Sequence, residues 1–361
     1  MTPRARVVAA LRGERTDRVP FTVYDSLITT SEAERRLRND GLCIILRSPP
    51  IYRVRSPNIR QTRTFFREPP SDAEDSADFI RTTVHTPNRD LWALERLGPG
   101  DTGASYVDHL FKGPEDYQAL ESLIRDRIYR PNHQEFAGLQ ESAGDDCFVL
   151  ADIGYEPLHE IIYELMGIQR FSVEWTERQD EVLRLYDVLV EDRRKRYAIA
   201  ADSPALAVNY GGNVSAETLG LDRFLEYHVP NYLEFSEILH ARGKLLGLHL
   251  DANNRLLAQA IADSGVDFLE GFTPDPDSDM TVSEARAAWP GKVLWLNFPP
   301  SIHLSEPHAI EDETRHILQA AAPGERFLMG ITEGVPRERW QKSYAAISRA
   351  IAADGGLPIK T

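Results

Sequence analysis

Residues 244–271 read KLLGLHLDANNRLLAQAIADSGVDFLEG, and the order of apolar and polar residues in this stretch decides the fold. The runs 244–250 and 266–271 are short and apolar, which is typical of strands buried on both faces. Between them, residues 253–263 repeat apolar side chains at helical spacing. Strand, helix and strand in this order predict a βαβ unit with two parallel strands.

The same alternation continues from residue 147 to the end of the chain. About eight apolar runs are strand candidates: 19–24, 42–47, 147–153, 205–210, 244–250, 266–271, 292–297 and 326–331. Amphipathic helices are predicted at 156–168, 177–200, 217–241 (interrupted at Pro230), 253–263, 281–288, 306–321 and 336–353. This pattern predicts an α/β protein, a (β/α)8 TIM barrel forming a single domain over residues 1–361. A doubly wound parallel sheet is the alternative, but the chain carries no fingerprint for it.

Two segments depart from the barrel pattern. Residues 50–105 are rich in Arg, Pro, Asp and Ser and contain extended stretches such as RTFFRE and FIRTTVHT. They predict a hairpin-rich insertion near one end of the barrel. Residues 191–198, EDRRKRYA, form a run of charges that predicts a solvated helix face.

Composition excludes several classes of protein. The chain has 41 Lys and Arg against 56 Asp and Glu, a formal charge of −15, so a nucleic-acid partner is disfavoured. No stretch of 18 apolar residues is present, and the first residues have too short an apolar run for a signal peptide. Cys43 and Cys147 lie in apolar strand candidates, so they predict buried thiols rather than a disulfide scaffold. We therefore expect a soluble, cytoplasmic protein that binds neither nucleic acid nor membrane.

Familiar catalytic motifs do not fit. Gly98, Gly100 and Gly103 have GxGxxG spacing in LGPGDTG, but no buried strand precedes them and Pro99 interrupts the loop. The chain has no GxxxxGK[ST], GxSxG or HExxH motif, and His159 has no second His four residues later. Phosphate-loop, esterase and zincin functions are therefore disfavoured.

Polar residues gather where the predicted strands end, which is where barrel enzymes carry their active sites. The candidates for catalysis at these positions are Asp152, Tyr210, Glu270 and Asn297. Asn209 and Asn213 lie on either side of Tyr210-Gly211-Gly212, which predicts either a simple turn or a wide mouth for a planar ligand or large cofactor. We assign these two asparagines to cofactor binding.

A metal site is predicted at the same end. His249 and Asp251 are two residues apart in a strand, so their side chains emerge on one face, and both are suitable ligands for zinc or another divalent ion. Glu333, after the last strand, is expected to converge from the opposite rim, and Glu270 to add a ligand or orient His249. The alternative is that Asp251 only holds His249 by a hydrogen bond. His303 and His308 lie in a Pro-rich loop and are predicted at the surface.

Three stretches resemble the uroporphyrinogen decarboxylase superfamily. RARVVAALRGERTDRVPF (4–21) resembles its opening helix and first strand, VDHLFKGPEDYQALESLIRD (107–126) resembles its middle region, and residues 239–280 resemble its metal-strand segment. The resemblance implies a (β/α)8 barrel with its active site at the carboxyl ends of the strands, and a homodimer. It is closest to the zinc-dependent, corrinoid-linked methyltransferase branch, because FTVYDSLITT (21–30) lacks the arginines with which the decarboxylase branch grips porphyrin carboxylates.

The metal ligands depart from that branch. Its zinc is held by a His-x-Cys motif and a later Cys, whereas this chain has His249-x-Asp251 and then Glu333. Oxygen ligands leave the ion a stronger Lewis acid, which suits an ether or hydroxyl oxygen better than a thiol. We therefore expect a methyltransferase that moves a methyl group between a small substrate, such as a methyl ether, and a corrinoid (cobalamin) carried on a partner protein. A decarboxylase or lyase of the same superfamily and a non-catalytic ligand-binding barrel are the alternatives.

Overall fold

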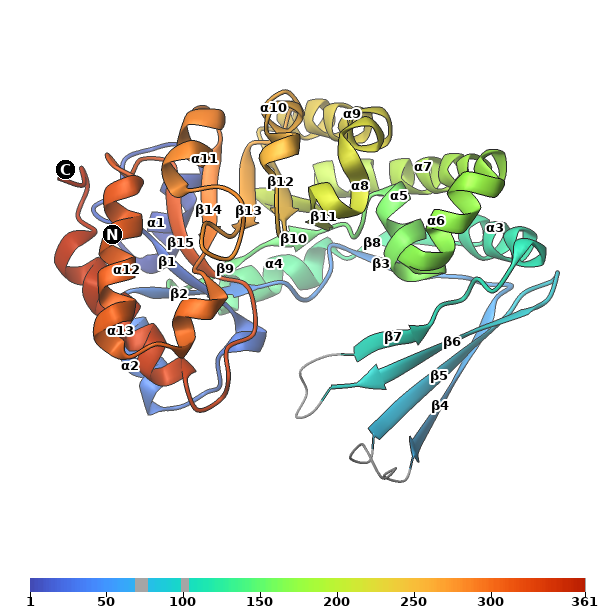
Figure 1. The fold of residues 1–361 in the computed structure, drawn as a ribbon, viewed down its shortest axis with the longest axis horizontal. Helices are drawn as coiled ribbons and strands as arrows, with labels where there is room; N and C mark the ends of the chain where they lie inside the picture. The colour runs from blue at the N-terminus through green and yellow to red at the C-terminus, as the bar shows by residue number, and fades with distance from the viewer. Residues whose placement is uncertain (69–76, 99–103, 361) are drawn as a thin grey trace. The chain divides into compact units, whose positions relative to one another are not determined.

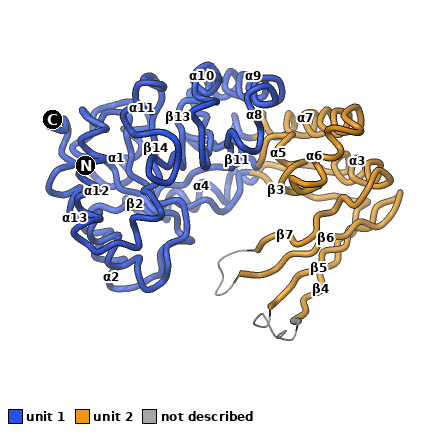
Figure 2. Tube along the Cα trace, in the orientation of Figure 1, with its two compact units in different colours: residues 1–51, 132–154, 200–361 blue, residues 52–131, 155–199 orange. Residues whose placement is uncertain are grey.

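The computed structural model of the chain describes residues 1–68, 77–98 and 104–360. It comprises two compact units (Figure 2): unit 1 has residues 1–51, 132–154 and 200–361, and unit 2 has residues 52–131 and 155–199. Gly100 and Gly103 of the glycine motif lie outside the described residues. A single domain over residues 1–361 stays a prediction.

Unit 1 is a parallel β-barrel (Figure 1). Its described strands are β1 (Phe21–Tyr24), β2 (Leu42–Leu46), β9 (Cys147–Val149), β10 (Ala151–Asp152), β11 (Ala207–Val214), β12 (Leu245–Leu250), β13 (Phe268–Phe272), β14 (Val293–Asn297) and β15 (Phe327–Ile331). They pair in the order β10-β11-β12-β13-β14-β15-β1-β2-β9. β9 and β10 are consecutive parts of one segment, and one pairs with β2 while the other pairs with β11, so the sheet closes on itself. The predicted (β/α)8 TIM barrel is confirmed.

The strands are buried on both faces, as their continuous apolar runs predict. Every residue of β13, β14 and β15 is buried. Trp295 of β14 packs in the core with Phe268 and Leu328, and its indole Nε1 donates a 2.9 Å hydrogen bond to Thr22 of β1. Burying the indole N–H in this way leaves it satisfied, so the large ring can occupy the core without an unpaired donor.

Helices follow the strands of unit 1. Their bounds are α1 (Pro3–Leu11), η1 (Asp25–Leu27), α2 (Glu32–Asn39), α4 (His133–Ser142), α8 (Ala216–Arg223), η5 (Phe224–His228), α9 (Val229–His240), η6 (Arg255–Leu257), α10 (Ala258–Ala262), α11 (Val282–Ala288), η7 (Pro300–Leu304), α12 (Pro307–Ala320) and α13 (Trp340–Asp354). A capping box starts α11, where Thr281 accepts from the N–H of Glu284 at 3.1 Å and Glu284 accepts from the N–H of Thr281 at 2.8 Å. Pro230 lies in the first turn of α9 and does not interrupt it; the break falls at Gly220, whose φ is 68°.

Unit 2 contains the predicted hairpin-rich insertion. The described strands β4 (Arg60–Glu68), β5 (Ala77–His85), β6 (Asp90–Leu97) and β7 (Ala104–Asp108) form an antiparallel sheet, and β3 (Tyr52–Arg55) pairs with β8 (Ile128–Pro131). The helices of this unit are η3 (Pro114–Asp116), α3 (Tyr117–Arg125), α5 (Pro157–Glu160), η4 (Ile161–Met166), α6 (Ile168–Glu177) and α7 (Gln179–Asp202).

The charge run on α7 is a solvated face only in part: Glu191, Arg194 and Lys195 are exposed, as predicted, but the other charged side chains of the run are not. Asp192, Arg193 and Arg196 are buried. Arg196 pairs with Asp192 at 2.7 Å, and Arg193 pairs with Glu160 of α5. Buried charges persist when they are paired, and the partner on α5 is distant in sequence, so local composition could not reveal it.

The predictions for the two cysteines and for His308 are confirmed, whereas the prediction for His303 is wrong. Cys43 and Cys147 are buried, as predicted, and burial raises the pKa of the Cys43 thiol. His308 is exposed, as predicted, but His303 is buried and its Nδ1 lies 2.5 Å from the Ser343 hydroxyl. The α13 residue that covers His303 follows it by 40 positions, so the loop sequence alone does not predict its burial.

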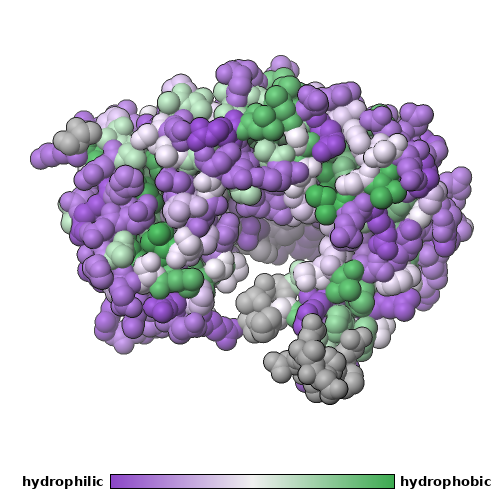
Figure 3. All heavy atoms as spheres, in the orientation of Figure 1, coloured by the Kyte–Doolittle hydropathy of each residue, from purple (hydrophilic) through white to green (hydrophobic). Residues whose placement is uncertain are grey.

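No helix in the described ranges is both long and apolar enough to cross a bilayer. The face seen in Figure 3 is mostly hydrophilic, with apolar residues in separate small patches.

Candidate active site

Glu270 is the centre of a buried hydrogen-bond network at the carboxyl ends of the barrel strands. Its side chain, on β13, is fully buried. The Tyr24 hydroxyl of β1 donates to its Oε1, the Asn209 amide of β11 donates to its Oε2 at 3.2 Å, and His249 Nδ1 on β12 also bonds Oε2. Because these donors come from three strands, the barrel itself fixes the position of the carboxylate.

Register and a glycine bring His249 against Glu270. The two residues are direct partners across the parallel pair of β12 and β13, so their side chains lie on the same face. Gly271 follows with φ 79°, and a Cβ at this position would lie 2.7 Å from His249 Cε1. The position therefore needs glycine both for its backbone conformation and for the space that the imidazole occupies.

Asp251 lies on the other side of the imidazole. His249 Nε2 is 3.7 Å from Asp251 Oδ1, which is longer than a hydrogen bond. Two donors bound to one tetrahedral zinc lie about 3.3–3.6 Å apart, given ligand distances of about 2.0–2.2 Å. The 3.7 Å separation is slightly wider than this range. Glu270 occupies Nδ1, so Nε2 and the Asp251 carboxylate have the residue types of a zinc site whose histidine is oriented by a carboxylate.

The electrostatics of the imidazole follow from these neighbours. Burial by itself would lower the pKa of His249, but the Glu270 and Asp251 carboxylates outweigh burial and raise that pKa to about 10. Without an ion, His249 is thus a cation between two carboxylates. A divalent cation at Nε2 would take the place of that proton and its positive charge.

Glu333 and Asp152 act on this pair through their charges, but among the described residues neither forms, with His249 and Asp251, a group of ligand atoms that all lie within 4.8 Å of one another. Glu333 is exposed just beyond β15, and partial desolvation together with the Asp251 carboxylate raises its pKa. β15 pairs with β1, as the predicted barrel closure requires. Asp152 ends β10 and accepts a 2.6 Å hydrogen bond from the N–H of Gly154. Its burial raises its pKa, against the opposing charges of Arg47 and His249.

Other predicted residues are placed in supporting positions. Asn209 donates a hydrogen bond to Glu270, as described above. Asn297 accepts from the N–H of Thr332 at 2.9 Å and donates to Thr273 at 3.0 Å, so it ties together the segments after β13, β14 and β15. Asn213 lies in β11 with φ 57°, next to a register irregularity, and its role in cofactor binding stays a prediction.

Tyr210 does not join this group. Its ring is fully buried and packs edge-on against Tyr232 and Phe235 of α9, with centroids 5.7 Å away in both cases. Successive residues of a strand point to opposite faces, so Asn209 reaches into the barrel while Tyr210 faces the helix. The predicted catalytic role of Tyr210 at the mouth is therefore wrong, because its side chain is on the helix side of β11.

Two residues of the site were missed. Tyr24 ends β1 and bonds Glu270, and the guanidinium carbon of Arg47 lies 3.8 Å from the centroid of the Tyr24 ring. Arg47 is the first charged residue after the buried run of β2. A polar residue at the carboxyl end of a barrel strand is a candidate site residue. The rule that indicated His249 therefore also indicates Arg47.

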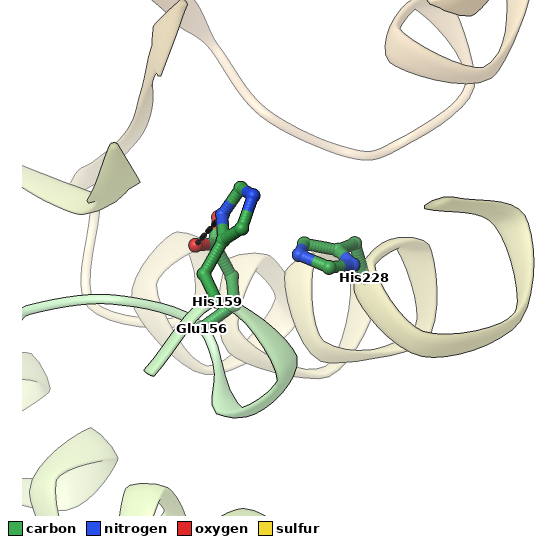
Figure 4. Close-up of side chains that lie close together, drawn as sticks. All are labelled: Glu156, His159 and His228. Atoms are coloured by element: carbon green, nitrogen blue, oxygen red, sulfur yellow. Dashed lines mark hydrogen bonds and ion pairs between the residues drawn. The ribbon is translucent and has the colours of Figure 1, made fainter. Parts of the chain in front are cut away.

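A second buried His and Glu pair occurs in unit 2. His159 Nδ1 lies 3.2 Å from Glu156 Oε2, and both side chains are fully buried (Figure 4). The two residues are three apart at the start of α5, where their side chains share one face. His228, also drawn in Figure 4, ends η5 of unit 1 and stacks on Phe224. His159, which lacks the second histidine of a zincin motif, is thus paired with Glu156.

Comparison with known proteins supports the fold. A methyltransferase from Methanosarcina mazei aligns with a TM-score of 0.58 over 98% of this chain and 99% of its own, at 13% identity. An L-Ala-D/L-Glu epimerase (TM-score 0.23, 11% identity, 83% of each chain) and MenC from Desulfotalea psychrophila LSv54 (TM-score 0.27, 9% identity, 84% of this chain and 93% of its own) align too poorly to support an argument. No family model and no curated protein matches. The chain therefore has a fold that a methyltransferase uses.

Proposed function

We propose that the protein is a metal-dependent methyltransferase that moves a methyl group between a small oxygen-bearing substrate and a corrinoid on a partner protein. The observation that carries this proposal is the line of Glu270, His249 and Asp251 at the barrel mouth. The fold shared with a methyltransferase supports it, as does the resemblance to the corrinoid-linked branch of the uroporphyrinogen decarboxylase superfamily.

His249 and Asp251 would hold the ion, and Glu333 is the proposed third ligand. A bound zinc ion supplies a Lewis acid that withdraws charge from the substrate oxygen. Glu270 keeps the imidazole oriented and its Nε2 directed away from β13. A reduced corrinoid on the partner protein would supply the acceptor for the methyl group, and the electron pair of the broken C–O bond would stay on the substrate oxygen. Asp152, whose pKa is raised by burial, holds the proton that the departing oxygen takes.

The oxygen-rich ligand set determines the substrate class in this proposal. Carboxylates leave more positive charge on the ion than thiolates do, so an ether or hydroxyl oxygen is the expected ligand from the substrate. A cytoplasmic location, a homodimer and a corrinoid-carrying partner are further parts of the proposal.

Arg47 favours a second candidate. A cation stacked on Tyr24 near Asp152 could bind an anionic substrate and allow acid–base chemistry without a metal, as in a decarboxylase or lyase. A non-catalytic binding barrel would use the same contacts without turnover.

Methyl transfer to free cobalamin separates these candidates. The zinc-loaded protein is mixed anaerobically with cob(I)alamin and methanol or methoxybenzene as oxygen-bound methyl donors, with dimethyl sulfide as the sulfur-bound control. We expect methylcob(III)alamin to form from an oxygen donor, and Asp251→Cys to bind zinc but lose this activity. A zinc-loaded protein that methylates cobalamin from neither oxygen donor, or only from dimethyl sulfide, would contradict the proposal.

A further inference from the structure

A cavity lies at the end of the unit 1 barrel opposite to the Glu270 network, where the strands begin. Its volume is about 340 Å³, and it is lined by Phe148 near the start of β9 and by residues 204–206 and 242–244, which precede β11 and β12. Lys244 lies at this end of β12, and His249 lies five residues later. At about 3.3 Å per residue, the two positions are roughly 16 Å apart. The cavity is therefore separate from the Glu270 network.

The charge of this cavity is opposite to that of the whole chain. Arg4, Arg12, Arg242 and Lys244 line it, and none of its described lining residues is acidic. The chain as a whole carries a formal charge of −15. Four cations on one concave surface of an acidic protein repel one another, and a bound anion would relieve that repulsion.

Two of the cations are held in place by backbone carbonyls. Arg4 Nε donates to the carbonyl of Cys147 at 2.7 Å, and Lys244 Nζ donates to the carbonyls of Ser203 and of Ala205, the latter at 2.6 Å. Carbonyl oxygens accept hydrogen bonds without neutralising the charge. Both side chains are therefore positioned, and neither forms an ion pair with a carboxylate among the described residues, although the charge of Asp202 acts on Lys244.

The other two cations are at the rim. Arg242 pairs with Asp202 at 3.0 Å, and both side chains are more than half exposed. The exposed guanidinium of Arg12 makes no hydrogen bond or ion pair with any residue that the structure describes. Three of the four cations therefore lack a carboxylate partner within the described residues.

We propose that this cavity binds a small polyanion, a molecule carrying two or more phosphate or carboxylate groups. Guanidinium groups present paired N–H donors that match the oxygens of both groups, and the ammonium group adds a point charge. A cavity of about 340 Å³ is at the lower end of the range for small-molecule sites. The acidic remainder of the chain disfavours a nucleic acid.

Calorimetric titration with pyrophosphate and with citrate, at constant ionic strength, tests the proposal. The wild-type protein should bind at least one of these probes, and the probe that binds identifies phosphate or carboxylate as the group recognised. Arg12→Gln should weaken binding about tenfold, as loss of one charged contact predicts. Arg12 is exposed, so its replacement should leave the fold intact by circular dichroism.

Two control variants make the result specific. Arg35→Gln, which removes an exposed arginine of α2 outside the cavity, should bind as wild type does. His249→Ala should also bind as wild type does, which excludes capture of the probes by a metal at the mouth. The proposal is overturned if neither probe binds, if Arg12→Gln and Arg35→Gln weaken binding equally, or if His249→Ala abolishes it.

Discussion

Replacing Glu270 by Gln tests how the barrel prepares His249 for a metal. Tyr24, Asn209 and His249 all bond the Glu270 carboxylate. The Gln amide keeps one acceptor oxygen and gains an NH2 group, so at least one of these donors loses its acceptor and the imidazole loses its negative partner. Hydrogen bonds to a charged group contribute about 1.5–3 kcal/mol. Removing the outer partner of a ligand histidine typically weakens metal binding about 10–100-fold, or about 1.4–2.7 kcal/mol.

Competition with a chromophoric zinc chelator measures this change on the metal-free protein. Glu270→Gln should bind zinc about 10–100-fold more weakly than wild type. Glu141→Gln, which neutralises an exposed carboxylate on α4, should bind as wild type does. Tyr24→Phe removes one donor but keeps the carboxylate, so its effect should be smaller. Zinc affinity of folded Glu270→Gln within twofold of wild type would refute the role given to Glu270.

Three further changes test other parts of the structure. Gly271→Ala places a Cβ 2.7 Å from His249 Cε1 and should weaken zinc binding at least tenfold in the same competition, whereas Gly291→Ala, with open space around it, should not. Burial lowers the pKa of His303 from 6.5 to about 4, so the unfolded chain binds more protons between these values and stability falls as pH drops from 6.5 to 4. The His303 contribution to that loss should be up to about 3 kcal/mol, so in urea titrations the loss should be smaller by that amount in His303→Phe than in wild type; equal losses in the two proteins would rule the role out. Trp295→Phe removes the hydrogen bond to Thr22 as well as volume and should lower stability by about 1–3 kcal/mol in the same titrations; no change would mean that this buried contact contributes nothing.

The barrel could be predicted because its signals are local. Continuous apolar runs separated by amphipathic helices report strands buried on both faces, and closure follows from their number and parallel order. The partnership of His249 and Glu270 could be anticipated for the same reason, since both stand near the ends of neighbouring strands. Polar residues that interrupt otherwise apolar strands mark positions directed into the mouth.

Contacts between distant segments, and the directions of the side chains that make them, could not be predicted from the sequence. The pairing of Arg193 with Glu160 and of His303 with Ser343 depends on how separate elements pack. Tyr210 is different, because adjacent residues of a strand point to opposite faces. Once Asn209 is assigned to the inside of the barrel, this rule predicts that Tyr210 lies outside the site. Arg47 was overlooked although it directly follows a buried strand.

The metal content of the purified protein tests the central claim most directly. Wild type and His249→Ala are incubated with zinc, freed of unbound metal by gel filtration, and measured by mass spectrometry, with circular dichroism confirming that both are folded. A site of this ligand set predicts about one zinc per wild-type chain and a loss of that zinc in His249→Ala. Equal zinc in both proteins, or none in the wild type, would contradict a metal centre on His249.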